Sequence, residues 1–223
     1  MLAESQKKMA RSLNDWFQTP LGLAVAQEFT VDLGHCNDYL HAEILLQLGN
    51  CGDNPWLSSL NYQRKWVASP VLLDHPIQLK CIYNQLPLDR NSVDCVIAPL
   101  TLEPFSHNFS LIDELDRVLK PMGYVIFLCI NPWSFWGAAL KSGLLHCFGD
   151  HKVKLRSPFN LNRALLQRGY RQIALSNFCY IPPINNAKII KKLTFLDEVG
   201  RMLWPFPSGF YCYIAQKYEP ITP

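Results

Sequence analysis

The sequence predicts an α/β fold in which helices and a mostly parallel β-sheet form three layers. Two short runs, Val93–Ala98 and Tyr124–Ile130, are almost entirely apolar and rich in β-branched residues, as in strands covered on both faces. Between them, Leu111, Leu115 and Val118 recur three or four residues apart, the spacing of a helix with one buried face. Strand, helix and buried strand in this order indicate a βαβ crossover with parallel strands.

Length favours one domain. The 223 residues are enough to bury a large core, and no internal repeat or low-complexity segment divides them. We therefore expect a single domain over residues 1–223. Within it, residues 1–40 are expected to form an N-terminal helical cap, and residues 131–156 and 182–207 are expected to form lid or insert segments.

Composition narrows the possible partners. The formal net charge of +3 is too small to argue for nucleic acid, so no nucleic-acid partner is expected. No run of about 18 uncharged apolar residues occurs, so no transmembrane helix is expected. The eight cysteines are scattered, without a C-x-x-C pair or closely spaced histidines. We therefore expect reduced, buried thiols, a cytoplasmic location and no metal site.

A family resemblance lies in the central forty residues. It rests on Leu86-Pro87-Leu88, Ser92 and Asp94 before one strand, and on Arg117-Val118-Leu119, Pro121 and Gly123 before the next. In this order they resemble the second half of class I S-adenosylmethionine-dependent methyltransferases of the type 11 group. The string Asn131–Gly137 (NPWSFWG) is similar to an uncharacterised bacterial branch of that family.

The resemblance implies the architecture and the cofactor. The fold would be a Rossmann-like three-layer sandwich with seven strands, the last antiparallel between the fifth and the sixth. S-adenosylmethionine would be the cofactor and S-adenosylhomocysteine the product. The opening Trp16–Gly22 (WFQTPLG) resembles a segment that forms a lid over the cofactor in that branch; a helical cap without function is the alternative.

The first cofactor contacts are expected in the turn after the strand Glu43–Leu48. Gly49, Asn50 and Gly52 stand where the family keeps a glycine-rich turn. Glycines let the backbone approach a ligand, and a following helix N-terminus offers unpaired amides. Gln47 replaces the acidic residue of the family pattern, so the turn itself is a weak signal.

Further contacts are expected at the ends of the next strands. Ser69 ends the second strand where the family has a carboxylate for the ribose, and Asn84, after a third strand Leu79–Tyr83, replaces the acid that receives the adenine amino group. An amide oxygen still accepts such a bond. The resemblance also places Gln85 and Leu86 at the cofactor. It puts Pro99, Leu100 and Thr101 beneath its methionine part.

Two residues after the fourth strand are candidate bases. Glu103 or His107 can remove a proton from a nucleophile at the carboxyl edge of the sheet. The alternative is a solvated loop carboxylate and a turn histidine. Methyl transfer to a strong nucleophile needs little acid–base help, so weak catalytic motifs do not exclude activity.

Two functions remain open at this point. The first is an S-adenosylmethionine-dependent methyltransferase that acts on a small, hydrophobic acceptor. The segment after the fifth strand is rich in Trp, Phe and Leu, which suits an apolar lid over such an acceptor; the alternative is that these rings fold into the core. The second is a degenerate methyltransferase fold that acts as a binding protein with weak or no cofactor binding. A dinucleotide oxidoreductase is poorly supported because G-x-G-x-x-G is absent. The sequence does not predict an oligomeric state.

Overall fold

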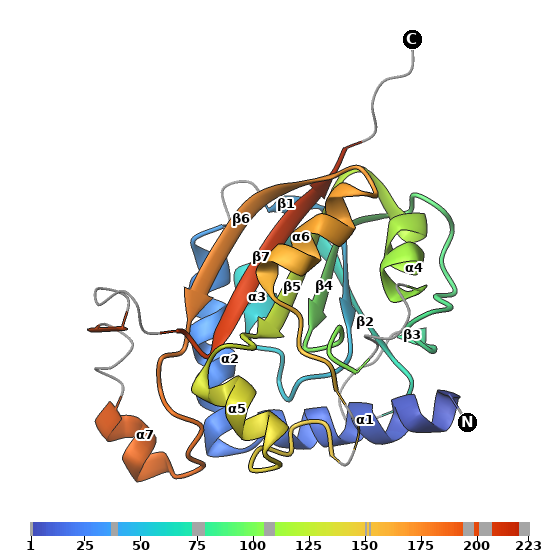
Figure 1. Ribbon diagram of the computed structural model, residues 1–223. Helices are drawn as coiled ribbons and strands as arrows, with labels where there is room; N and C mark the ends of the chain where they lie inside the picture. Colours follow the sequence, from blue (N-terminus) through green and yellow to red (C-terminus); the bar gives the residue numbers. More distant parts are fainter. Residues whose placement is uncertain are drawn as a thin grey trace.

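The computed structural model describes residues 2–36, 40–72, 79–104, 110–149, 151, 153–193, 199–200 and 207–218, and these form seven strands in one sheet (Figure 1). The strand order is β3-β2-β1-β4-β5-β7-β6. Neighbouring strands from β3 to β5 are parallel, and β7 is antiparallel to both β5 and β6. The predicted fold and the predicted place of the last strand are therefore confirmed. The strands are β1 (His41–Leu48), β2 (Asn61–Ser69), β3 (Leu79–Lys80), β4 (Val93–Pro99), β5 (Leu119–Ile130), β6 (Tyr170–Phe178) and β7 (Phe210–Lys217).

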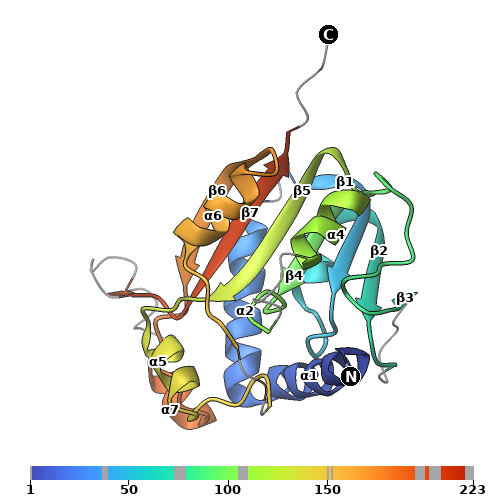
Figure 2. The ribbon, with the colours of Figure 1, turned by 45° about the vertical axis from the view of Figure 1, so that its right-hand side comes forward.

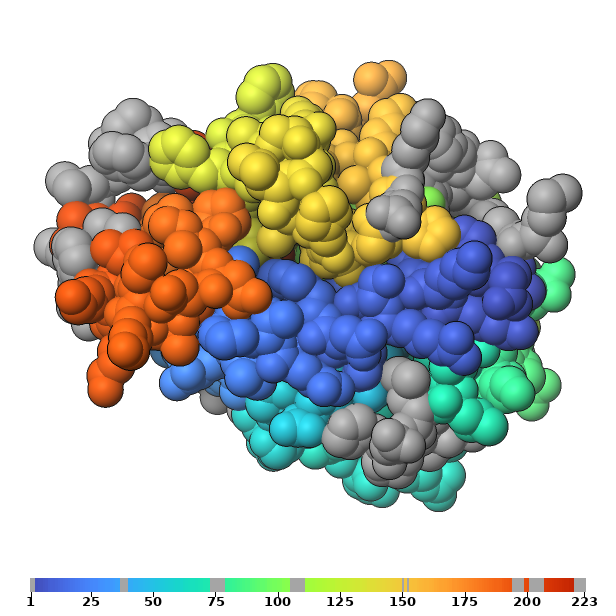
Figure 3. Space-filling view, turned by 90° about the horizontal axis from the view of Figure 1, so that it is seen from below, coloured from blue at the N-terminus to red at the C-terminus, as the bar shows by residue number. Residues whose placement is uncertain are grey.

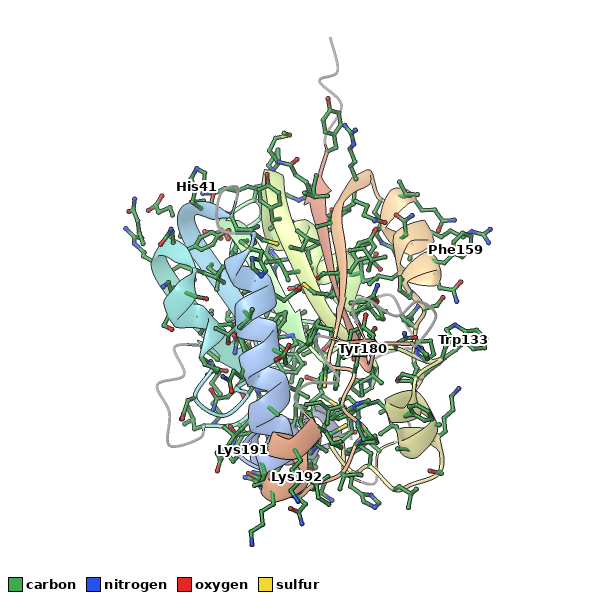
Figure 4. The ribbon with its side chains drawn as sticks, turned by 90° about the vertical axis from the view of Figure 1, so that its left-hand side faces the viewer. His41, Trp133, Phe159, Tyr180, Lys191 and Lys192 are labelled. Atoms are coloured by element: carbon green, nitrogen blue, oxygen red, sulfur yellow. The ribbon has the colours of Figure 1, made fainter. Side chains whose placement is uncertain are left out.

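Helices form the two outer layers. The described helices are α1 (Leu2–Phe17), α2 (Pro20–Gly34), α3 (Trp56–Ser59), α4 (Ser110–Val118), α5 (Phe135–Lys141), α6 (Pro158–Leu166) and α7 (Ala187–Leu193). α2 lies on one face of the sheet, while α4 and α6 lie on the other (Figures 2 and 4). α1 runs across the edge where the parallel strands end, below the arrowheads of β4 and β5 (Figure 1).

The centre of the sheet is apolar on both faces. In β4, Cys95, Val96, Ile97 and Ala98 are fully buried. In β5, all residues from Val125 to Ile130 are buried. Burial on both faces is the reason that these strands read as continuous apolar runs instead of alternating patterns. The prediction of two buried parallel strands joined by a helix is confirmed.

The start of β5 differs from the prediction. The sequence indicates a turn at Pro121–Gly123, yet β5 already begins at Leu119, which pairs with Val93. The register then shifts, so that Cys95 pairs with Tyr124. The intervening residues bulge out of the ladder, because proline cannot donate a ladder hydrogen bond and Met122 has a positive φ of 62°.

The third strand is shorter than predicted. It pairs with β2 only through Leu79 and Lys80, and the Cys81 amide adds one further bond to the Ser69 carbonyl. Ile82 and Gln85 then form a bridge with each other, so the chain turns back on itself. Residues 81–83 therefore belong to a turn, in which Tyr83 is buried and Cys81 and Ile82 are partly exposed.

The cysteines behave as expected, since all eight are free thiols and six of them are buried. Within the described part of the chain, no helix is long and apolar enough to cross a membrane. The same residues contain no group of three His, Cys, Asp or Glu side chains arranged to hold a metal ion.

Candidate cofactor site

The turn after β1 contains residues with positive φ angles and is stabilised by hydrogen bonds from amide side chains. Gly49 and Gly52 have φ values of 84° and 62°, a region that favours glycine. Asn54, also at positive φ, accepts from the Cys51 amide at 2.9 Å and donates to the Asn50 side chain at 2.6 Å. The turn therefore keeps its shape without a ligand.

Gln47, which replaces the family's acidic residue, stabilises the turn after β1 through hydrogen bonds of its side chain. Its fully buried Nε2 donates to the Gly49 carbonyl at 2.8 Å and to Asn54 Oδ1 at 2.5 Å, and its Oε1 accepts from the Trp56 indole at 2.7 Å. A carboxylate cannot donate the first two of these bonds. The amide therefore suits a turn whose polar groups are satisfied within the protein.

α1 supplies the remaining partners of this turn. Asn14 Oδ1 accepts from the Gly52 amide at 3.2 Å and from the Asn50 side chain at 2.8 Å. About two helical turns earlier, Gln6 Oε1 accepts from the Tyr83 amide at 3.0 Å. Both α1 side chains are almost fully buried. Backbone amides at the carboxyl edge of the sheet are thus capped by α1.

Tyr83 fills the space between the ends of β1 and β2. Its hydroxyl lies 3.0 Å from the position of the Cβ that Gly49 lacks, and it forms a hydrogen bond with the Ser69 side chain. Tyr83 is only 1% exposed, and this burial raises the pKa of its hydroxyl far above the usual range. Neutral Tyr83 therefore bridges two of the predicted cofactor positions.

The predicted cofactor residues come from four neighbouring strands of the sheet, β3, β2, β1 and β4. Gly49, Asn50 and Gly52 follow β1, and Ser69 ends β2. Pro99 ends β4, and Leu100, with a positive φ of 51°, turns the chain into Thr101. Thr101 is fully buried, and its hydroxyl has no hydrogen-bond partner in the described protein.

The segment after β3 is divided between two places. Asn84 Oδ1 accepts from Gln6 Nε2 at 3.3 Å, which places it under α1. Gln85 is exposed. Leu86 is drawn to α4, because its amide donates to Glu114 and its carbonyl accepts from Arg117, and it lines a separate cavity of about 440 Å³. The structure does not bring Leu86 to the glycine turn.

Glu103 is buried, so the alternative that it is a solvated loop carboxylate is wrong. It is 1% exposed, and its Oε1 accepts from the Ile130 amide at 2.9 Å. Burial raises its pKa to about 7, and the bond from the Ile130 amide opposes that shift. The Glu103 side chain therefore connects the loop after β4 with the last residue of β5 through a hydrogen bond. His107 lies outside the described residues.

Sequence reasoning did not identify Gln6, Asn14 and Tyr83 as parts of the site. The two α1 residues are polar positions on an amphipathic helix, where exposure is the ordinary expectation. Their only sequence signal is indirect: the neutral Gln47 and Asn84 stand where the family has acids, and neutral groups can pair with amides.

Known proteins match both the sequence and the fold. The family model described as a methyltransferase domain matches residues 52–127. The chain therefore has the fold of the class I S-adenosylmethionine-dependent methyltransferases, and its central part resembles a methyltransferase domain. A similar sequence is the ubiquinone/menaquinone biosynthesis C-methyltransferase UbiE of Nitrosospira multiformis, which is 30% identical over 104 residues. That match covers 45% of this chain and 42% of the relative, so the chain matches less than half of that protein's length.

Solved structures agree with the fold. A chain from the complex of the Haloferax volcanii Trm112 methyltransferase activator with a methyltransferase has a TM-score of 0.67 at 11% identity, over 96% of this chain and 100% of that one. An S-adenosylmethionine-dependent methyltransferase from Archaeoglobus fulgidus has a TM-score of 0.59 at 17% identity, over 85% and 93%. At these identities the likeness supports the fold and nothing finer.

Proposed function

We propose that the chain is an S-adenosylmethionine-dependent methyltransferase that acts on a small, hydrophobic acceptor. The observation that carries the proposal is the turn after β1, where Gly49 and Gly52 adopt positive φ at the carboxyl edge of a methyltransferase-type sheet. α/β sheets place their ligands at this edge. The match of residues 52–127 to the methyltransferase domain supports the same assignment.

Cofactor binding at the proposed site requires an exchange of hydrogen-bond partners. The Gly52 and Tyr83 amides are donors suited to a nucleoside, but they now donate to Asn14 and Gln6. The unpartnered Thr101 hydroxyl at the end of β4 offers a further contact for the cofactor. We propose that Gly49, Asn50, Gly52, Ser69 and Asn84 hold the nucleoside, that Gln85 borders it, and that Pro99, Leu100 and Thr101 lie beneath the methionine part. Leu86, which lines a separate cavity beside α4, is not included.

Bound S-adenosylmethionine supplies an activated methyl group on its sulfonium. The chain's part is to orient the two reactants and keep water out, and such positioning supplies much of the rate of a methyl transfer. Glu103 is proposed as a positioning residue, since its carboxyl holds the β4 exit against the Ile130 amide. His107 remains a proposed base after the fourth strand.

The hydrophobic acceptor is supported by the segment after β5. Trp133, Phe135 and Leu144 are each well over half exposed, which is unusual for large apolar side chains grouped within twelve residues. The UbiE relative is named for the biosynthesis of ubiquinone and menaquinone, both hydrophobic molecules. The proposal extends that acceptor class to this chain.

Titration with S-adenosylhomocysteine tests the function. We expect binding by calorimetry, and ligand at ~100 times its dissociation constant should stabilise the fold by about 2.7 kcal/mol. Gly49→Ala should abolish binding, because its methyl group meets Tyr83 at 3.0 Å at the centre of the site. Gly169→Ala is the matched control, since Gly169 has a similar φ of 80° and its Cβ would meet the Tyr218 carbonyl at 3.1 Å instead of a residue of the proposed site. Failure of the natural chain to bind at millimolar ligand would favour the degenerate binding protein.

A further inference from the structure

A second candidate site lies between α5 and the segment that follows it. We call it the basic cavity; its volume is about 650 Å³, within the range of small-molecule sites. Four basic side chains line it, Lys141, His146, His151 and Lys154. Apolar side chains line the rest, including Leu140, Phe148, Val153 and Leu155.

The described residues that line the basic cavity include positive side chains and no negative ones. Among them there is no Asp or Glu. Within the described part of the chain, neither Lys141 nor Lys154 forms an ion pair. The surrounding sequence strengthens this bias, because Asp150 is the single acidic residue between positions 117 and 192, against twelve lysines and arginines. Positive groups without carboxylate partners attract an anion.

The basic cavity adjoins the exits of β4 and β5. The Lys154 amide donates to the Glu103 carbonyl at 3.0 Å, and Pro132, which lines the cavity, comes two residues after the end of β5. The far side of the cavity segment is held against α1, since a Cβ on Gly149 would meet Ser12 Oγ at 2.8 Å. The space-filling view shows this segment lying along α1 (Figure 3). A ligand there would border the edge where the cofactor is proposed to bind.

We propose that the basic cavity binds an amphipathic anion, whose carboxylate or phosphate lies at Lys141 and Lys154 and whose apolar body packs on the partly exposed Leu140 and Val153. This proposal deepens the proposed function and rests on it in one respect: the anion would be the methyl acceptor. The assignment of an amphipathic anion is based on the combination of apolar and basic side chains in the cavity lining. Apolar side chains supply contact area. The ammonium groups of Lys141 and Lys154, which form no ion pair within the described part of the chain, select the charged end.

Binding of simple probes to the full chain tests the proposal. Calorimetry with decanoate, decyl phosphate, decanol and decyltrimethylammonium compares negative, neutral and positive head groups on the same ten-carbon chain. We expect the two anions to bind at least tenfold more tightly than decanol, and the cation to bind more weakly than decanol. Tighter binding of decanoate than of decyl phosphate would indicate a carboxylate ligand, and the reverse order would indicate a phosphate ligand. The advantage of the anions should shrink as salt rises, since exposed charges are screened.

Variants locate the site. Lys141→Gln and Lys154→Gln should each weaken decanoate binding about fivefold and leave decanol unchanged. Lys188→Gln is the control, because Lys188 is an exposed lysine on α7 that does not line the cavity. Equal binding of decanoate and decanol would overturn the proposal, as would an equal loss with Lys188→Gln.

A parallel titration with S-adenosylhomocysteine separates the two proposals. If S-adenosylhomocysteine binds and the anions do not, the basic cavity is not a ligand site and the proposed function stands. If the anions bind and S-adenosylhomocysteine does not, the cavity stands as an anion site and its role as acceptor site is overturned.

Discussion

Gln6 Nε2 lies 3.3 Å from Asn84 Oδ1, so a helix at the start of the chain contacts a residue predicted to receive the adenine amino group. The same Gln6 amide also accepts from the Tyr83 backbone, and Asn14 repeats the arrangement at Gly52. The donors and acceptors of the proposed nucleoside site are therefore paired with α1 side chains. A cofactor at this site would compete with those side chains for the same groups.

Removal of Gln6 should strengthen cofactor binding. Gln6→Ala removes the hydrogen bonds that Gln6 forms with the Tyr83 amide and with the Asn84 side chain. Each such bond contributes about 1 kcal/mol, and both groups become available to the cofactor. We expect the dissociation constant of S-adenosylhomocysteine to fall between five- and thirtyfold, measured by calorimetry.

Lys7→Ala controls for any general effect on α1. Lys7 is exposed and pairs with Glu4 at 3.3 Å, an arrangement that contributes little at a surface. Weaker binding by Gln6→Ala than by the natural chain would contradict the competition, and would mean that Gln6 contacts the cofactor directly.

Gln47→Glu should destabilise the fold. The new carboxylate would face the Gly49 carbonyl and Asn54 Oδ1, two acceptors, in a position that is 0% exposed. A buried carboxylate without a counter-charge would then face two oxygen atoms and would remove their hydrogen bonds from Gln47, so we expect the free energy of unfolding to fall by roughly 3 to 5 kcal/mol. Urea denaturation measures the loss. Gln63→Glu, at an exposed position of β2, should change stability by less than about 0.5 kcal/mol.

Part of this structure could be predicted from sequence and part could not. β4 and β5 were predictable because strands buried on both faces leave continuous apolar runs, as in Val96 and Ile97. The start of β5 at Leu119 could not be predicted. Pro121 and Gly123 indicate a turn, but the same residue types also occur in a bulge within a strand, which is what the structure has. The partners of the glycine turn were hidden for another reason. Asn14 and Gly52 are 38 residues apart, and no local pattern marks that contact.

Glu103 should make stability depend on pH. Its pKa is about 7 in the folded chain and near the ordinary 4.5 when unfolded, so the folded state holds the proton more tightly. Its contribution is fully favourable below pH 4.5 and is lost as pH rises to about 7. A difference of about 2.5 units corresponds to roughly 3 kcal/mol.

Glu103→Gln should remove that part of the pH dependence. The amide oxygen can still accept from the Ile130 backbone, so the variant should match the natural chain near pH 4.5 and exceed its stability at pH 8. Urea denaturation between pH 4.5 and 8.5 measures both. Glu43→Gln serves as the control, because Glu43 is exposed and forms an ion pair with the exposed Arg64. An identical pH profile for the natural chain and Glu103→Gln would show that the buried carboxyl is not shifted.

Gly209 fixes the segment after β5 to the start of β7, and Gly209→Ala should disrupt it. A Cβ at this position would lie 2.5 Å from the Trp136 ring and 2.7 Å from the Cys179 carbonyl. Trp136 cannot easily move away, because its indole donates to the Ile181 carbonyl at 2.7 Å and its ring packs on Phe210 with centroids 4.7 Å apart. We expect a loss of roughly 2 to 3 kcal/mol by thermal or urea denaturation. Gly34→Ala, at a helix end with open space around it, should not destabilise the chain. Equal stability of the two alanine variants would mean that Trp136 and the Cys179 carbonyl yield to the methyl group, and that the NPWSFWG segment is less firmly packed than these contacts imply.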